Sequence, residues 1–297
     1  MTAQRVIGVD LGGTKILAGV IRRDGSVERH RETATRTESQ AALLDGLEAA
    51  VREVLDEDVA AVGFGIPSRI EQASGRVERS VNIPLDAIDF RAQMVQRLGI
   101  RVGIANDASA ATLAEFVSGA GRGAETIVML TLGTGVGAGV VLDGRLYSGW
   151  AEFGHMVIEF DGEPCFGACN GRGHLEAYVS GSAATRAAQD TFGEAADAHR
   201  LVRLGREGDA QALAVLDAIG RRLGTGIESL VNAFNPEIVV IGGGFAAADE
   251  LILGPARELV RERALAPANE RVRIVRAELG TLAGMIGAGL VAFEAQS

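Results

Sequence analysis

Two cysteines and a histidine lie close together in one glycine-rich stretch, EPCFGACNGRGHLE, at residues 163–176. The chain has only two cysteines and four histidines, so this stretch holds both of its thiols. Thiolates and imidazoles are typical zinc ligands, and glycines let a loop bend around an ion. The stretch can be a metal clip, a redox pair or two idle thiols. The C-x-x-x-C spacing argues against a redox pair, which typically uses C-x-x-C.

Three glycine-rich turns, each directly after a strand-like run, are candidates for binding phosphate. They are Gly12-Gly13-Thr14, Gly133-Thr134-Gly135 and Gly242-Gly243-Gly244. Without a Cβ in the way, glycine lets backbone N–H groups approach phosphate oxygens. The first turn is not a P-loop, because the order Gly-Lys-Ser/Thr is absent. The third turn, GGGFAA, opens a helix, which can place a nucleotide at the helix N-terminus.

Two acids are candidates for chemistry on a phosphoryl group. Asp107 stands where a strand gives way to a helix, so its carboxylate can accept a proton from an attacking hydroxyl or can cap the helix. Asp10 precedes the first glycine turn and can hold Mg²⁺ or be an ordinary strand-end acid. Lys15, the single lysine beside 28 arginines, can neutralise phosphate or be a solvated side chain.

The composition excludes several classes of protein. The chain has 297 residues, a net charge of −10 and a hydrophobic fraction of 47%. Acidity disfavours nucleic acid and anionic membranes as partners, and no apolar run reaches the ~18 residues of a membrane span. The amino terminus shows no secretory signal pattern, and a chain with two cysteines suits a reducing compartment. We therefore expect a cytoplasmic protein that does not bind a membrane or nucleic acid.

The motifs fall on alternating strands and helices. The pattern predicts a hairpin over residues 5–27, helices over 39–55 and 208–234, and an apolar helix at the carboxyl terminus. It predicts buried strands over 59–67 and 237–244. A strand followed by a helix is expected over 101–121, and a second strand–turn–strand segment over 125–147.

The second strand–turn–strand segment repeats the first. DLGGT at residues 10–14 corresponds to TLGTG at 131–135, and Asp24-Gly25 corresponds to Asp143-Gly144 with a two-residue gap. Because strands, turns and spacing all agree, we expect two similar α/β domains, each opened by one copy.

In this order, the motifs resemble the ROK family of sugar kinases and related repressors. VDLGGTK, ANDASAA, LTLGTGVGAG, AEFGHM, GRGHLEAYVSG and NPEIVVIGGG carry the resemblance over essentially the whole chain. It implies an actin-like ATPase (ribonuclease H-like) α/β fold with two similar domains around a central cleft. We expect residues 1–112 with 283–297 to form the smaller domain, and 113–282 to form the larger one with the nucleotide site and a zinc loop.

The resemblance also implies roles for individual residues. Asp107 would be the catalytic base and would contact the sugar, and Asp10 would hold Mg²⁺. The sugar would be bound by Gly65, Asn106, Glu152, His155 and Glu176. Nucleotide phosphates would be bound by Asp10, Gly12, Gly13, Thr14, Lys15, Gly133, Thr134, Gly135, Gly243 and Gly244.

The family commonly holds a structural zinc with the His of an E-x-G-H motif and three cysteines in C-x-C-G-x-x-G-C. This chain departs from that pattern: His174 replaces the last cysteine, Cys169 matches the middle one, and Gly167 occupies the first position. Cys165 lies two residues before that glycine. The implied ligands are His155, Cys165, Cys169 and His174, a Cys₂His₂ set.

The implied activity is an ATP-dependent sugar kinase that phosphorylates the 6-hydroxyl of a hexose, with glucose as the default acceptor. Alternatives are kinases of fructose, mannose, N-acetylglucosamine or N-acetylmannosamine, a sugar-sensing regulator, and a dinucleotide-dependent oxidoreductase. A repressor is disfavoured because DLGGT begins at residue 10, which leaves no room for an N-terminal helix-turn-helix. Ser68 stands where many members have glycine, some relatives use polyphosphate, and family kinases are often homodimers.

Overall fold

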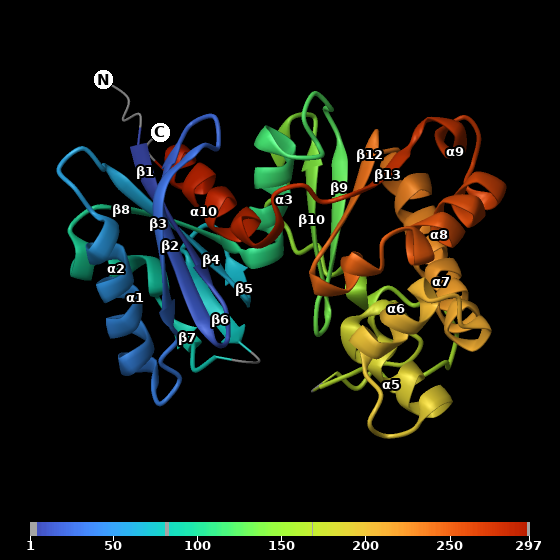
Figure 1. The fold of residues 1–297 in the computed structure, drawn as a ribbon. Helices are drawn as coiled ribbons and strands as arrows, with labels where there is room; N and C mark the ends of the chain where they lie inside the picture. Colours follow the sequence, from blue (N-terminus) through green and yellow to red (C-terminus); the bar gives the residue numbers. More distant parts are fainter. Residues whose placement is uncertain (1–4, 81–82, 168, 296–297) are drawn as a thin grey trace. The chain divides into compact units, whose positions relative to one another are not determined.

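The computed structural model describes residues 5–80, 83–167 and 169–295, and the chain forms two compact units (Figure 1). Unit 1 contains residues 1–122, 146–150 and 278–297, and unit 2 contains residues 123–145 and 151–277. The domain boundaries at 112 and 283 remain a prediction beside these units.

Unit 1 is built on a five-stranded sheet in the order β3-β2-β1-β4-β8, in which β1–β3 are antiparallel and β4 and β8 run parallel to β1. A small sheet has the order β5-β6-β7. The strands are β1 (Arg5–Leu11), β2 (Lys15–Arg22), β3 (Val27–Ala34), β4 (Ala61–Ile66), β5 (Ser68–Glu71), β6 (Arg76–Ser80), β7 (Asp86–Ile88) and β8 (Arg101–Asn106). The helices are α1 (Gln40–Val54), α2 (Phe90–Leu98), α3 (Asp107–Ser118), the 3₁₀ turn η3 (Gly280–Leu282) and α10 (Ala283–Glu294).

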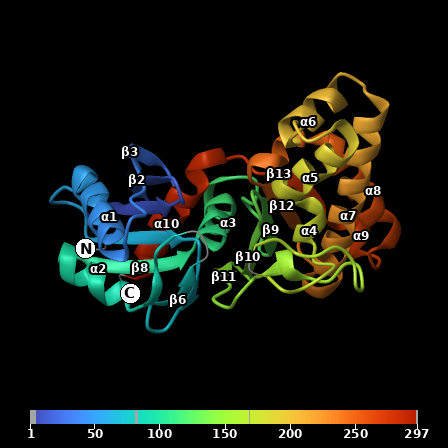
Figure 2. The same cartoon turned by 90° about the horizontal axis from the view of Figure 1, so that it is seen from below.

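Unit 2 is built on a sheet in the order β11-β10-β9-β12-β13, and Figures 1 and 2 show α5, α6 and α7 grouped on one side of it. The strands are β9 (Ile127–Leu132), β10 (Val136–Leu142), β11 (Arg145–Leu146), β12 (Ile238–Gly242) and β13 (Arg273–Arg276). The helices are α4 (Glu176–Val179), α5 (Gly181–Phe192), α6 (Ala198–Arg206), α7 (Ala210–Phe234), α8 (Glu250–Arg263) and α9 (Ala268–Arg271), with 3₁₀ turns η1 (Phe153–His155) and η2 (Gly244–Ala248).

The two sheets have the same topology: an antiparallel meander of three strands, then two parallel strands added beside the first. This confirms the predicted α/β fold class and the repeat of the first segment by the second. Every predicted strand and helix is present, and α1 begins after Ser39, whose side chain accepts a hydrogen bond from the Ala42 N–H. Among the described residues, no helix is both long and apolar enough to pass through a bilayer.

Helix α10 packs unusually close to the sheet of unit 1 because glycines line the contact. A Cβ added to Gly8 would lie 1.9 Å from the Met285 carbonyl oxygen, and one on Gly63 would lie 1.8 Å from that of Ala288. The alternate residues of these strands, such as Ile7, Val9 and Phe64, point to the other face and join the core under α1. The sheet is therefore fixed between helices on both faces.

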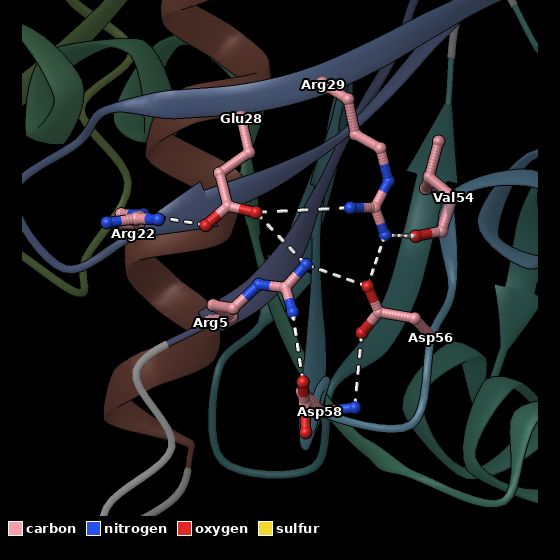
Figure 3. Close-up of polar contacts among 7 residues, drawn as sticks. All are labelled: Arg5, Arg22, Glu28, Arg29, Val54, Asp56 and Asp58. Atoms are coloured by element: carbon pink, nitrogen blue, oxygen red, sulfur yellow. Dashed lines mark hydrogen bonds and ion pairs between the residues drawn. The ribbon is translucent and has the colours of Figure 1, made fainter.

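An ion-pair network fixes the amino end of β1 (Figure 3). The Arg5 guanidinium lies 2.7 Å from Asp56 and 3.0 Å from Glu28, and Arg29 donates to both Asp56 and the Val54 carbonyl. The pKa of Asp56 is lowered, and the main cause is the hydrogen bond that Arg29 donates to its carboxylate. The network joins β1, β3 and the loop after α1. It lies at the amino end of β1 and does not include Asp10, which lies near the carboxyl end of that strand.

Candidate active site

The carboxyl ends of three neighbouring strands bring the candidate residues of unit 1 to one edge of the sheet. Asp10 of β1 pairs in register with Gly65 of β4, and Ile66 of β4 pairs with Asn106 of β8. Asp107 follows Asn106 directly as the first residue of α3. In open α/β sheets, ligands bind at this edge.

Asn106, not Asp107, caps helix α3. The Asn106 Oδ1 atom accepts hydrogen bonds from the Ala108 and Ser109 N–H groups at 3.0 and 3.2 Å, while its amide nitrogen lies 3.5 Å from the Ser68 carbonyl oxygen. Asp107 accepts one bond from Ala108, at 2.9 Å. The capping role that competed with a catalytic role for Asp107 is thus filled by its neighbour.

Asp10 is held in a setting that disfavours its negative charge. A Cβ on Gly284 would lie 2.5 Å from the Asp10 carboxyl carbon, so this carboxylate packs against the start of α10. Burial, then the nearby charge of Asp107, raise the pKa of Asp10 to about 7, and Lys15 only partly opposes them. A half-buried carboxylate beside a second one is a chemically suitable ligand set for Mg²⁺, because oxygen donors and an unbalanced negative charge suit a hard cation.

The first glycine turn closes the β1–β2 hairpin. Gly12 N–H bonds to the Lys15 carbonyl at 2.9 Å, and the Thr35 hydroxyl donates to the Gly12 carbonyl at 2.7 Å. Gly13 and Thr14 at the tip are exposed. Lys15 is also exposed and forms an ion pair with Glu32 at 2.9 Å.

The second glycine turn closes the β9–β10 hairpin and is supported from below by Glu176. The Glu176 Oε2 atom accepts the Val136 N–H at 2.7 Å, and a Cβ on Gly135 would lie 2.4 Å from that same oxygen. The Gly133 carbonyl accepts the Gly181 N–H at 2.7 Å. The turn therefore depends on Gly135 having no side chain.

A pocket of about 840 Å³ lies beside this second turn. Its lining includes Gly133 and Thr134, the start of α5, most of one side of α6, and Gly244 of the third turn. Gly243 does not line it; its φ of +84° and a Cβ clash of 2.5 Å with Leu132 explain why glycine is needed there. A glycine turn that can bind phosphate, next to a pocket of this volume, suits a nucleotide.

Sequence reasoning missed the α5–α6 wall of this pocket. Arg186, His199, Arg203 and Arg206 line it together with the acid Asp197. For the three basic residues of α6, His199, Arg203 and Arg206, the available signal was their helical spacing of four and three positions.

The four predicted zinc ligands converge. One ligand atom each of His155, Cys165, Cys169 and His174 lies within 4.8 Å of the others. The Nδ1 atoms of His155 and His174 are 3.2 Å apart, and Cys169 Sγ lies 3.8 and 3.5 Å from them. Cys165 Sγ is 3.9 Å from His155 Nδ1.

The four distances between named ligand atoms, from 3.2 to 3.9 Å, are close to those around a tetrahedral ion. Zinc bonds of about 2.0 Å to nitrogen and 2.3 Å to sulfur separate the ligand atoms by about 3.3–3.8 Å. Both cysteines are free thiols. Burial and the charge of Glu176 raise the pKa of Cys165 to about 12, and burial followed by the charge of His155 lowers the pKa of His174. A metal ion binds neutral imidazoles, and its positive charge would favour the thiolate forms of the two cysteines. The four side chains therefore suit a zinc ion.

Of the sugar-binding candidates in unit 2, His155 belongs to this cluster, Glu176 contacts it, and Glu152 lies three residues before His155 in the chain. Each contact of His155 with the cluster uses Nδ1, so Nε2 lies on the other side of its ring. Glu152 is exposed directly before η1, and Glu176 lies between Cys165, at 3.7 Å, and the second glycine turn. The structure thus brings His155 and Glu176 to one cluster, and Gly65, Asn106 and Asp107 to one edge of the other unit.

Comparison with known proteins gives concordant results. The ROK family model matches residues 6–295. A glucokinase from Thermotoga maritima is 35% identical, with 99% of each chain covered. Among solved structures, the ROK hexokinase from Thermus thermophilus is 34% identical at a TM-score of 0.86, covering 98% of both chains. A ROK family glucokinase from Streptomyces griseus, in complex with glucose and AMPPNP, is 31% identical at a TM-score of 0.82, covering 98% of this chain and 99% of its own.

Proposed function

This chain belongs to the ROK family, and on that basis we propose that it transfers the γ-phosphoryl group of ATP to the 6-hydroxyl of a hexose, with glucose as the expected acceptor. It is a sugar kinase, a phosphotransferase, because its glucokinase relatives match it over nearly the whole length. The observation that carries the proposed mechanism is the position of Asp107: it follows β8, beside Asp10, and its helix is capped by another residue.

In the proposed reaction, the 6-hydroxyl oxygen attacks the γ-phosphorus. The new oxygen–phosphorus bond forms while the bond from the γ-phosphorus to the ADP oxygen breaks, and the hydroxyl proton passes to the carboxylate of Asp107. When bound, Mg²⁺ would supply positive charge to the phosphate oxygens, with Asp10 as its ligand. Backbone N–H groups of the turns at 12–14 and 133–135 would bind the phosphates, and Gly244 would contact the nucleoside.

In the proposed site, the sugar would be selected by side chains that hydrogen-bond its hydroxyls and by its close approach to the backbone of Gly65. A Cβ on Gly65 would meet its nearest neighbour only at 3.5 Å, so packing alone does not demand glycine there. Close approach of a ligand to the backbone explains that residue. Glu152, His155 and Glu176 would bind ring hydroxyls, and zinc on the Nδ1 side of His155 would fix the orientation of its Nε2.

The surroundings of Asn106 favour a second candidate, a kinase of another hexose or of an N-acetylhexosamine. Ser68 is buried and its hydroxyl is hydrogen-bonded to Ser80, while its carbonyl lies near the Asn106 amide. Ser68 thus adds a buried side chain beside a predicted sugar contact. We further propose a cytoplasmic homodimer that uses Mg²⁺ and carries a structural zinc.

A coupled assay that detects ADP, run over glucose, fructose, mannose, N-acetylglucosamine and N-acetylmannosamine, tests the proposal. We expect the highest kcat/KM with glucose and ATP. A higher value with another sugar would move the acceptor assignment to that sugar. Absence of ADP formation with every sugar, in protein that binds ATP, would contradict the kinase activity; polyphosphate in place of ATP tests the donor.

A further inference from the structure

One residue of the Cys/His loop reaches the pocket beside the second glycine turn. Among the described residues that line this pocket, Phe166 alone comes from the segment that carries the cysteines; the others belong to the turn, to α5, α6 and the residue before α6, or to η2. The ring is half-buried. The pocket of the proposed phosphoryl donor is therefore partly built by the loop of the proposed zinc site.

The backbone of Phe166 is set by the two cysteines. Phe166 follows Cys165 directly, and its carbonyl accepts the Cys169 N–H at 3.4 Å. Phe166 is therefore joined to one cysteine by a peptide bond and to the other by a hydrogen bond. Fixing both sulfur atoms on one ion would fix both of these attachments of Phe166.

The side chain of Phe166 is held by Arg186 of α5. The guanidinium carbon lies 5.0 Å from the ring centroid, within range of a cation–π contact. Arg186 also donates to the Ala177 carbonyl at 2.8 Å and lies 3.8 Å from Glu163. Because its two terminal nitrogens have these partners, the guanidinium is held in place as a support for the ring.

A second route leads from the cluster to the same turn. Glu176 accepts a weak bond from Cys165 at 3.7 Å with one carboxylate oxygen and the Val136 N–H at 2.7 Å with the other. Two residues in contact with the cluster therefore support the region where nucleotide phosphates are expected: Glu176 from below the turn and Phe166 from the wall of the pocket.

We propose that Phe166 is a wall of the phosphoryl-donor pocket and that the Cys/His cluster positions it, so that metal binding to the cluster strengthens the binding of the nucleotide. The inference rests on the proposed function, because it takes the pocket as the nucleotide site. It separates two effects of the cluster. His155 links the metal to the sugar and Phe166 links it to the nucleotide, while Glu176 contacts both the cluster and the second glycine turn.

Calorimetric titration with ADP, and separately with glucose, tests this on zinc-loaded protein. Phe166→Ala should weaken ADP binding about tenfold, equal to about 1.4 kcal/mol, and change glucose binding by less than about twofold. The matched control is Phe160→Ala, since Phe160 lies six residues before Phe166 but is 96% exposed and does not line the pocket. It should leave both affinities unchanged.

Removal of the metal from the wild type and from Phe166→Ala tests whether the two changes act through the same contact, as in a double-mutant cycle. Chelator-treated wild-type protein should lose at least as much ADP affinity as Phe166→Ala does, and the substitution should have little further effect once the metal is gone. Equal losses from Phe166→Ala with and without metal would overturn the link to the cluster. An unchanged ADP affinity in folded, zinc-loaded Phe166→Ala would overturn the role of the residue.

Two further results keep this test separate from that of the proposed function. If the wild-type protein phosphorylates a hexose but Phe166→Ala binds ADP normally, only the present inference fails. If the wild-type protein forms no ADP with any sugar, the kinase assignment fails. Should Phe166→Ala melt early or lose zinc, Phe166→Leu keeps an apolar side chain in the loop, and we expect an ADP affinity between those of the wild type and the alanine variant.

Discussion

The first and second glycine hairpins have the same place in their sheets and different surroundings. Each joins the first two strands of a sheet with the same strand order, and each ends at the edge where parallel strands end. The first carries Asp10 beside Asp107, with a pKa raised to about 7. The second has Thr131 in the corresponding place and is supported by Glu176 and the Cys/His cluster.

This difference suits a proposed division of roles, in which the first copy of the repeated segment serves the chemical step and the second serves binding. The first copy holds negative charge close to the proposed base, so in the proposed mechanism it would depend on a cation. The second copy holds a neutral turn beside a large pocket, and its support is mechanical. Changes to the first hairpin should therefore affect the chemical step, and changes to the second should affect binding and stability.

The largest expected difference is between Asp10→Asn and Thr131→Ala. At saturating Mg²⁺, Asp10→Asn should lower kcat/KM by about 10²-fold or more, because it removes the ligand that would hold charge at the phosphates. Thr131→Ala, at the corresponding position, should lower it less than about tenfold. Similar losses in both variants, measured by steady-state kinetics, would break the assigned division of roles.

The same Asp10→Asn variant should have the opposite effect on stability. The folded-state pKa of Asp10 is about 7 against an ordinary value of 3.8, so the folded protein holds this proton more tightly than the unfolded chain does. The carboxylate therefore lowers stability progressively as pH rises from about 4 to about 7. In metal-free protein at pH 8, the variant should melt at least about 2 °C above the wild type.

At pH 4 the two melting curves should nearly coincide. Asp143→Asn is the control for net charge, because Asp143 is an exposed acid at the turn that corresponds to Asp24-Gly25, and its φ of +48° is one that asparagine also adopts readily. A higher melting point at pH 8 in this control as well would point to net charge rather than to the burial of Asp10.

Removal of zinc should affect binding at the second glycine hairpin and the Cys/His cluster beside it, and should leave the first hairpin unchanged. We expect about one zinc per chain by elemental analysis, and replacement of Cys165 and Cys169 by serine should abolish it. Loss of the metal should weaken glucose binding about 10- to 100-fold, since it removes the anchor of His155. Protein purified without chelator that contains no zinc would contradict the assignment of the cluster.

Alanine at the two ends of the second turn gives a finer test. At Gly133 an added Cβ meets nothing nearer than 3.9 Å, whereas at Gly135 it would displace the Glu176 carboxylate from 2.4 Å away. Gly135→Ala should cost about 1 kcal/mol of unfolding free energy through the lost Val136 hydrogen bond and should weaken glucose binding. Gly133→Ala should keep stability and glucose binding. Equal melting points for the two variants would mean that Glu176 does not support the turn.

Much of the fold could be predicted from the sequence because apolar periodicity and glycine turns are local signals. The repeat of DLGGT by TLGTG predicted the shared topology of the two sheets, and the ends of α1 and α7 follow from Ser39 and Asp209 as caps. The small sheet of β5–β7 was not predicted, since its strands are short and rich in charged residues.

The site was predictable where residues share a motif and not where distant elements meet. The four cluster residues came from family spacing, and the structure brings them together. The sequence could not show that Asn106 rather than Asp107 caps α3, because both neighbours are good caps. Nor could it show that Phe166 contacts Arg186, since 20 residues of irregular chain and helix separate them.

Asp107→Asn provides the most direct measurement of the division between the two regions. Turnover of glucose with ATP should fall by about 10³-fold or more, because the amide cannot accept the hydroxyl proton, while calorimetry should give glucose and ADP affinities within about threefold of the wild type. Near-normal turnover in this variant, or a loss explained entirely by weaker glucose binding, would contradict the role of Asp107 as the base at the edge of the first sheet.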